Sequence, residues 1–239
     1  MDLLATLAHT IRQLYSNLMP IPCLLCGAPN HEGCLCDACQ AHLPLLGAAC
    51  PRCASPLQQV MLCGQCLHSP PEQDASFSVF SYQSPLDHLI ADLKYRDKLA
   101  LIHLFTTHMS HHLKHRVKPD ALIPIPLHPR RLRERGFNQS LELAKHLSRQ
   151  LAIPVRHDIL IRVRDTPPQA SLPFSERKKN IDQAFQLKCS DIPAHIALID
   201  DVLTTGHTAN VAAKLLRQTG VNTIEVWTIA RTIKHSHSL

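Results

Sequence analysis

No run of apolar residues in this 239-residue chain approaches the ~20 that a membrane-spanning helix requires. The order of a positively charged segment, an apolar segment and a cleavage site, which marks an export signal, is also missing. We therefore expect a protein that has no membrane span and works in the cytoplasm.

Basic side chains are scarce in the first third of the chain. Residues 1–75 carry two basic and five acidic side chains, whereas residues 76–239 carry 23 basic and 14 acidic ones. The net charge of +6 thus combines a segment of −3 with a segment of +9. The basic part suits an anionic ligand, either nucleotide-like or polymeric. The acidic part is unsuited to gripping nucleic-acid phosphates directly.

Cysteine is nearly absent outside one short segment, because only Cys189 lies beyond residues 23–66. The change in composition near Pro70-Pro71 indicates a domain boundary. We expect an N-terminal helix and a cysteine-rich zinc module in residues 1–70 and an α/β domain in residues 71–239, and the chain is long enough for both.

The clustered cysteines form four Cys-x-x-Cys pairs, a spacing that places two thiolates on one metal ion from a tight turn. Two such pairs complete a tetrahedral zinc site. A disulfide framework fits less well, because no export signal is visible and such pairs rarely form structural bridges. A redox dithiol would need one pair, not four. We predict one or two zinc ions bound by Cys23, Cys26, Cys36, Cys39, Cys50, Cys53, Cys63 and Cys66.

The choice and pairing of these ligands leave two points open. Cys34 is an alternative to Cys36, although its spacing to Cys39 does not match the motif. The pairs can combine sequentially, as 23/26/36/39 and 50/53/63/66, or crosswise. The nine-residue intervals within each sequential set favour the sequential arrangement. Apolar residues are few in this segment, so we expect metal binding to supply much of its folding energy.

The most informative stretch lies at residues 196–208, with the sequence IALIDDVLTTGHT. An apolar run of strand length ends in Asp200 and Asp201, a short loop follows, and residues 209–218 have the apolar spacing of a helix. A capped helix after a buried strand would explain the hydroxyl residues. It would not explain two adjacent carboxylates, which are costly in a core. Their placement suits binding of vicinal sugar hydroxyls, or of Mg²⁺ through water.

The loop after these acids has the composition of a phosphate site. The unpaired N–H groups and positive dipole of a helix N-terminus favour an anion. Three threonine hydroxyls add donors, and the glycine allows close approach of the backbone. The predicted loop consists of Thr204, Thr205, Gly206, His207 and Thr208.

Apolar periodicity predicts further elements around this motif. The expected helices cover residues 1–19, 86–95, 99–116 and 140–151, and the expected strands 76–83, 121–126, 155–161 and 223–230. Strands that alternate with helices, and ligand residues that follow strand ends, predict a doubly wound parallel sheet with its site at the carboxyl edge. Four histidines share one face of helix 99–116 and could bind a metal, but no carboxylate in that helix supports ligation, so a solvated polar face is preferred.

Arginine is concentrated after strand 121–126, with four arginines in six residues. This density indicates an anion site, because guanidinium groups bind phosphate or pyrophosphate through two N–H groups. We interpret the stretch as a loop. A second basic segment, 162–180, contains prolines and is typical of a lid. The predicted pyrophosphate or DNA contacts are Arg130, Arg131, Arg133, Arg135, Arg164, Arg177, Lys178 and Lys179.

Residues 200–208, DDVLTTGHT, resemble the phosphoribosyl pyrophosphate (PRPP) signature of type I phosphoribosyltransferases. The resemblance implies a sheet like that of these enzymes. It also implies PRPP bound with Mg²⁺, contacts of Asp200 and Asp201 with the ribose hydroxyls, and residues 204–208 around the 5′-phosphate. His207 stands where that family more usually has a small residue.

Nearly the full length is similar to the ComF competence family, also called the GntX family. The cysteine pairs resemble its double zinc ribbon, residues 124–128 and 130–139 its central signature, and residues 166–169 and 177–180 its flexible-loop signature. The resemblance implies a bacterial protein of natural transformation that acts on single-stranded DNA at the cytoplasmic side, at the inner face of the inner membrane. The implied partners are a ComF-type helicase and the inner-membrane DNA channel.

Two functions of different classes are compatible with these patterns. In the first, a binding protein holds PRPP or a related sugar phosphate and uses its basic segments for single-stranded DNA. In the second, a transferase moves ribose 5-phosphate from PRPP to a nitrogenous base, with Asp200 and Asp201 orienting the ribose. The large number of cations around the pocket favours the first, since an enzyme needs only a few. A zinc-stapled scaffold without ligand chemistry is a third and weaker interpretation.

Overall fold

The computed structural model describes residues 20–96, 98–165, 184–189 and 191–233. The predicted helix at residues 1–19 and most of the predicted lid, including Arg177, Lys178 and Lys179, lie outside these residues. Within the described ranges, no helix is both long enough and apolar enough to cross a membrane.

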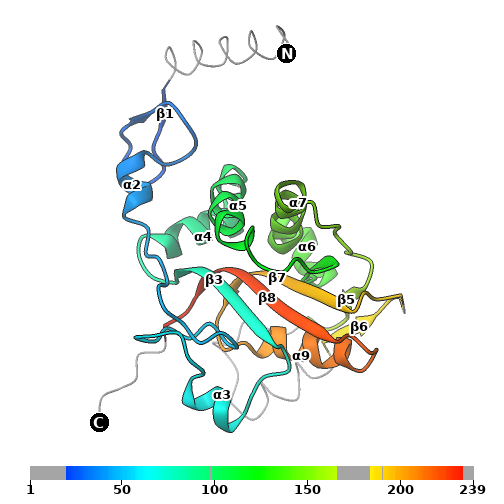
Figure 1. Cartoon of the computed structure of the whole chain (residues 1–239). Coiled ribbons are helices and arrows are strands. Elements are labelled where there is room, and N and C mark those ends of the chain that lie inside the picture. Colours follow the sequence, from blue (N-terminus) through cyan, green and yellow to red (C-terminus); the bar gives the residue numbers. More distant parts are fainter. Residues whose placement is uncertain (1–19, 97, 166–183, 190, 234–239) are drawn as a thin grey trace, which may run out of the picture.

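A four-stranded parallel sheet forms the centre of the fold, in the order β3-β8-β7-β4 (Figure 1). The strands are β3 (Ala75–Ser81), β4 (Ala121–Pro124), β7 (His195–Leu203) and β8 (Thr223–Arg231). The central strands β7 and β8 are buried on both faces over most of their length, which explains the apolar run 196–199 in β7 and the many apolar residues of β8. This arrangement confirms the predicted α/β class and parallel sheet.

Helices cover both faces of this sheet (Figure 1). On one face lie α4 (Leu86–Tyr95), α5 (Ala100–Leu113) and α7 (Gln139–Leu151), and on the other lies α9 (His207–Arg217). The smaller elements are β1 (Ile21–Pro22), β2 (Pro29–Asn30), α2 (Asp37–Ala41), α3 (Gly64–His68), α6 (Pro129–Arg135), β5 (Leu160–Arg162) and β6 (Phe185–Leu187). The fold is therefore a three-layer α/β domain with the cysteine-rich segment attached.

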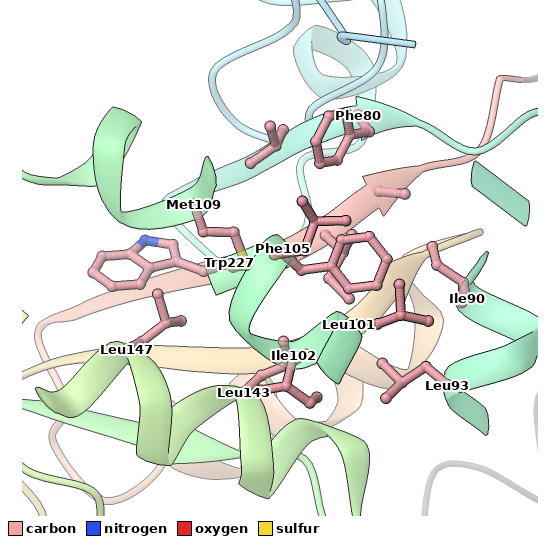
Figure 2. Packing of buried hydrophobic residues seen from close by; sticks show 14 of the residues in the cluster. Phe80, Ile90, Leu93, Leu101, Ile102, Phe105, Met109, Leu143, Leu147 and Trp227 are labelled. Carbon is pink, nitrogen blue, oxygen red and sulfur yellow. The ribbon is translucent and has the colours of Figure 1, made fainter. Parts of the chain in front are cut away.

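The larger core lies between the sheet and helices α5 and α7 (Figure 2). Phe105 and Met109 of α5 pack there with Leu143 and Leu147 of α7 and with Trp227 of β8. The indole N–H of Trp227 donates to Glu225 at 2.8 Å, so the buried ring keeps a polar partner.

A second core lies under α9. Ile196 and Leu198 of β7 point into this core, whereas Ala197 and Ile199 point into the larger one. The alternation follows from the pleat of a strand, which sends successive side chains to opposite faces. Because both faces of β7 are occupied by cores, its middle residues are apolar, and its polar side chains are His195 at the start and Asp200 and Asp201 toward the carboxyl end.

The cysteine-rich segment is joined to the free edge of β3. The backbone N–H of Leu46 donates to Val79 O at 2.9 Å, and that of Ser76 donates to Pro51 O at 2.9 Å. Ser81 N–H donates to Pro44 O at 2.8 Å. These bonds satisfy backbone groups that an edge strand would otherwise leave open.

The arginine-rich stretch is not the predicted loop but helix α6. His128 accepts a hydrogen bond from the backbone N–H of Arg130 at 3.3 Å, and Pro129 occupies the first helical turn. Gly136 ends the helix in the left-handed conformation, with φ of 78°. Cap, proline and terminal glycine are all visible in the sequence, so the loop interpretation gave too much weight to charge.

The predicted strand 155–161 is wrong over most of its length. Val155 forms only an isolated bridge with Leu122, and Arg156 pairs with Asp158 at 2.9 Å in the turn that follows. Strand β5 is short and pairs antiparallel with β6, a strand that the sequence did not indicate. The two lie on opposite sides of residues 166–183, so their pairing is a long-range property of the fold.

Candidate functional site

An acid pair lies toward the carboxyl end of β7, and three elements meet at it. The hydroxyl of Ser140, at the start of α7, donates to Asp200 Oδ1 at 3.0 Å. The backbone N–H of Asp201 donates to the same oxygen at 2.9 Å. Lys94 Nζ, from the last turn of α4, lies 3.0 Å from Asp201 Oδ2.

Asp201 influences the ionisation of Asp200. Burial, followed by repulsion from Asp201, raises the pKa of Asp200 to about 7 in spite of the nearby Lys94 and Ser140. Burial lowers the pKa of Lys94, but its attraction to Asp201 outweighs this effect and leaves the pKa raised. At neutral pH the site therefore holds a cation against an acid pair that is only partly ionised. Such a pair can accept hydrogen bonds from a diol.

The predicted phosphate loop starts where β7 ends. Gly206 adopts the left-handed conformation with φ of 77° and precedes the first residue of α9. Thr204 and Thr205 are exposed, and Thr205 Oγ1 accepts a hydrogen bond from the N–H of His207 at 3.3 Å. The loop thus places exposed hydroxyls at the N-terminus of an 11-residue helix, beside the acid pair.

The arginines of α6 have several different partners, and two of them share Asp165. Arg130 pairs with Glu134 at 3.0 Å and lies 3.7 Å from Asp165, and Arg131 pairs with Asp165 at 3.1 Å. Arg135 donates to Gln139 and stacks over Tyr95. Arg133 is exposed on α6, and Arg164 is exposed after β5. The pyrophosphate or DNA contacts of these arginines stay a prediction.

Arg162, at the end of β5, interacts electrostatically with both Arg131 and Asp200. Burial, followed by repulsion from Arg131, lowers its pKa, whereas Asp200 and Asp165 act in the opposite direction. A cavity of about 410 Å³ lies beside it, with Phe137, Leu141 and Leu160 in its walls. The cavity is lined by residues from the end of β4, from helix α6 and from strand β5.

The eight predicted cysteines form two separate clusters, 23/26/36/39 and 50/53/63/66, in which all four sulfurs lie within 4.8 Å of one another. The Sγ atoms of Cys26 and Cys36 are 3.7 Å apart, and those of Cys53 and Cys63 are 3.6 Å apart. A tetrahedral zinc site with Zn–S bonds of about 2.3 Å has S–S edges of about 3.8 Å. The geometry fits two zinc ions and confirms the sequential arrangement.

Cys34 is not a member of either cluster, which decides the open choice in favour of Cys36. Its thiol is buried and points toward Ala100 O at 4.0 Å. Burial raises the pKa of Cys34, as expected for a thiol that packs as a small apolar residue. None of the described cysteines forms a disulfide.

Each cluster contains one sulfur that backbone N–H groups favour as a thiolate. Burial raises the pKa of Cys23, but N–H donors from Cys26, Cys36 and Leu25 outweigh it and lower the pKa to about 6. Burial likewise raises the pKa of Cys50, but backbone N–H donors outweigh this effect and lower the pKa to about 7. Neighbouring sulfurs raise the pKa of Cys39 to about 12. Four thiolates this close therefore require a cation, which a zinc ion would supply.

Two contacts of the acid pair and one nearby cation were missed at the level of sequence. Lys94 was placed on a helix but not in the site, Ser140 was assigned only to the start of a helix, and Arg162 was assigned only to a basic segment. Each lies far from Asp200 in sequence, and no local spacing connects them. The fold alone brings them together.

We expect two zinc ions per full-length chain. Cys36→Ser and Cys63→Ser should each reduce the content to about one ion, because three sulfurs no longer complete a tetrahedral site. Elemental analysis of the purified proteins measures this. A parent protein with a single ion, or a variant that retains two, would contradict the two-cluster assignment.

The raised pKa of Asp200 predicts a pH-dependent stability. The carboxyl of an unfolded aspartate ionises near pH 4, so between that pH and about 7 the folded chain holds one more proton, and its stability falls as the pH rises. Asp200→Asn keeps an oxygen for Ser140 but carries no charge. Its Tm should therefore gain about 2–4 °C over the parent at pH 8, the shift that roughly 1 kcal/mol produces in a chain of this size.

The gain from Asp200→Asn should shrink at pH 5, where the parent residue is largely protonated. Asp191→Asn, whose side chain is 98% exposed, is the matched control and should show no such pH-dependent gain. Thermal unfolding at the two pH values gives the comparison. Equal effects of Asp200→Asn at both values would show that the carboxyl is already ionised at pH 5.

Comparison with known proteins supports the cysteine-rich part of the structure. A family model described as a double zinc ribbon domain matches residues 14–67. Among solved structures, a purine phosphoribosyltransferase from Pyrococcus horikoshii matches with a TM-score of 0.35 and 19% identity, over 56% of this chain and 84% of that one. This overall similarity is too low to support a conclusion about activity.

Sequence relatives cover almost the whole chain. Competence protein F of Haemophilus influenzae is 36% identical over 230 residues, which are 90% of this chain and 99% of that protein. The DNA utilization protein YhgH of Salmonella typhimurium is 34% identical over 90% of this chain and 99% of its own length. Competence protein ComFC of Streptococcus pneumoniae is 28% identical over 87% of this chain and 99% of its own length. The extent and level of this identity show that the chain belongs to the family of competence protein F, YhgH and ComFC.

Proposed function

We propose that this protein binds PRPP or a closely related sugar phosphate with Mg²⁺ and handles single-stranded DNA during DNA uptake, on the cytoplasmic side of the membrane. The observation that carries the proposal is the acid pair of β7 followed directly by the N-terminus of α9. Carboxylates for a diol and N–H groups for a phosphate then lie within one short stretch, as a 5-phosphorylated ribose requires.

The described residues suggest how each part of the ligand would be held. Asp200 and Asp201 accept hydrogen bonds from the ribose hydroxyls, and Ser140 fixes the orientation of Asp200. The hydroxyls of Thr204 and Thr205 and the N–H groups of the loop surround the 5′-phosphate. Lys94 supplies positive charge next to the acids in the ligand-free protein. Mg²⁺ would neutralise the pyrophosphate, contacting the acid pair through water.

The DNA part of the proposal rests on charge and on relatives. Two relatives are named competence proteins and another a DNA utilization protein. Arg133 is exposed on α6 and Arg164 just after β5, and both elements contribute residues to the cavity whose wall contains Phe137, so a strand could pair its phosphates with arginines and stack a base on the ring. The helicase and the inner-membrane DNA channel of natural transformation are the proposed partners.

Calorimetric titration with PRPP and Mg²⁺ tests the sugar-phosphate site. The parent should bind, and Asp201→Asn should weaken binding at least about tenfold, because a lost charge-assisted hydrogen bond has a cost of that size. Asp191→Asn, with its exposed side chain, should bind as the parent does. An Asp201→Asn variant with unchanged affinity would show that the ribose does not lie at the acid pair.

Fluorescence anisotropy with a labelled oligothymidine tests the DNA surface. The affinity should fall steeply as salt rises from about 50 to 200 mM, since phosphate contacts release counterions. Arg133→Ala should weaken binding and make the salt dependence shallower by about one contact. Lys214→Ala, which removes an exposed cation on α9, is the control and should change little. Binding that does not respond to salt would contradict the proposed phosphate contacts.

A further inference from the structure

Arg231, the last residue of β8, joins the phosphate loop to the second cysteine cluster. The residue is only 4% exposed, although it carries a guanidinium group. On one side its Nη1 donates to Leu203 O at 2.8 Å and to Thr204 O. On the other its Nε donates to Cys53 O at 3.0 Å.

A side-chain relay extends this link to a cluster sulfur. Arg231 Nη2 donates to Ser55 Oγ at 3.3 Å, and Ser55 Oγ lies 3.2 Å from Cys53 Sγ. A predicted metal ligand is thus connected through Ser55 and Arg231 to the first carbonyl groups of the phosphate loop. Leu203 and Arg231 are also direct neighbours in the β7–β8 register, so the link is short and its backbone ends are rigid.

Arg231 holds the start of the predicted phosphate loop, at the carbonyl groups of Leu203 and Thr204. By holding the carbonyls of Leu203 and Thr204, the guanidinium keeps two acceptors paired that would repel a phosphate if they turned toward it. Guanidinium donors lie in a fixed plane, so several carbonyls held at once are fixed relative to one another. A buried charge is tolerated only with such partners, and two of them belong to the cluster segment.

The first cluster has no comparable connection among the described residues. Apolar packing against the larger core connects this cluster to the α/β domain, through Cys23, Cys36 and Cys39. Outside the cluster, Cys34 adds one long contact to Ala100 O. Figure 1 shows β1 and α2 beyond α4, far from α9 and its loop. The two clusters fit the same metal but differ in what they touch.

We propose that the metal-bound second cluster sets the shape of the phosphate loop through Arg231, so that this cluster, and not the first, controls sugar-phosphate binding. Arg231 is then a positioning residue that needs no contact with the ligand. The inference rests on the proposed function for its ligand, but the loop's conformation can be measured without any ligand.

Hydrogen–deuterium exchange of the ligand-free, full-length protein is the direct test. Cys63→Ser and Cys36→Ser are matched, because each removes one half-buried sulfur from a close S–S pair, in the second and the first cluster respectively. We expect amides of residues 203–208 to exchange roughly tenfold or more faster in Cys63→Ser and as in the parent in Cys36→Ser. Equal exchange of this loop in the two variants would overturn the inference.

Arg231→Lys and Ser55→Ala keep all eight ligands and decide the question if Cys63→Ser does not fold. Both should retain the zinc content of the parent. Arg231→Lys removes several hydrogen bonds, so it should accelerate exchange of the loop and weaken PRPP binding about tenfold or more. Ser55→Ala removes one of these connections, so both effects should be only a few-fold. A parent that fails to bind PRPP would contradict the proposed function alone, whereas a loop unaffected by Arg231→Lys would overturn the coupling.

Discussion

The pairing of β7 with β8 is the interaction on which the rest of the structure depends. Both strands are buried on two faces, so neither can carry a charged side chain in its middle without a partner. Glu225, near the start of β8, has His195 and Trp227 as partners. The remaining charges stand toward the carboxyl ends, where Asp200 and Asp201 precede the phosphate loop and Arg231 lies opposite Leu203. One pair of strands thus positions Asp200 and Asp201, the start of the loop, and Arg231, which holds the loop carbonyl groups.

Charge is balanced at this end of the sheet by groups from different layers. Lys94 from α4 compensates Asp201, and Ser140 from α7 holds Asp200, whose pKa is nevertheless raised by burial. Such a site is suited to a ligand with hydrogen-bond donors. A sugar diol would donate hydrogen bonds to carboxylates that have only a few donors from the protein. The raised pKa of Asp200 also implies that stability falls as the pH rises toward 7.

The cysteine-rich segment solves a different problem, because it has too few apolar residues for a core of its own. Two four-cysteine clusters can supply the missing folding energy through metal, and backbone bonds fasten the segment to the edge of β3. This attachment brings the second cluster next to Arg231. A structural metal site thereby becomes a neighbour of the anion loop, and its state can influence what the loop binds.

The sequence by itself determined the strands and helices with strong periodicity, the two cysteine sets and the strand–loop–helix around Asp200 to Thr208, because the residues that form each of these are close together along the chain. The prediction of a loop in place of α6 was wrong, because the arginines were given more weight than the cap and the terminal glycine. The pairing of β5 with β6 was not predicted, because the two strands are separated by a long segment. Only the tertiary structure decided that Lys94 and Ser140 contact the acid pair, that Arg162 lies near enough to Asp200 for their charges to interact, and that Arg231 links the loop to Cys53. Contacts between residues distant in sequence follow from the packing of whole elements, and no local spacing records them.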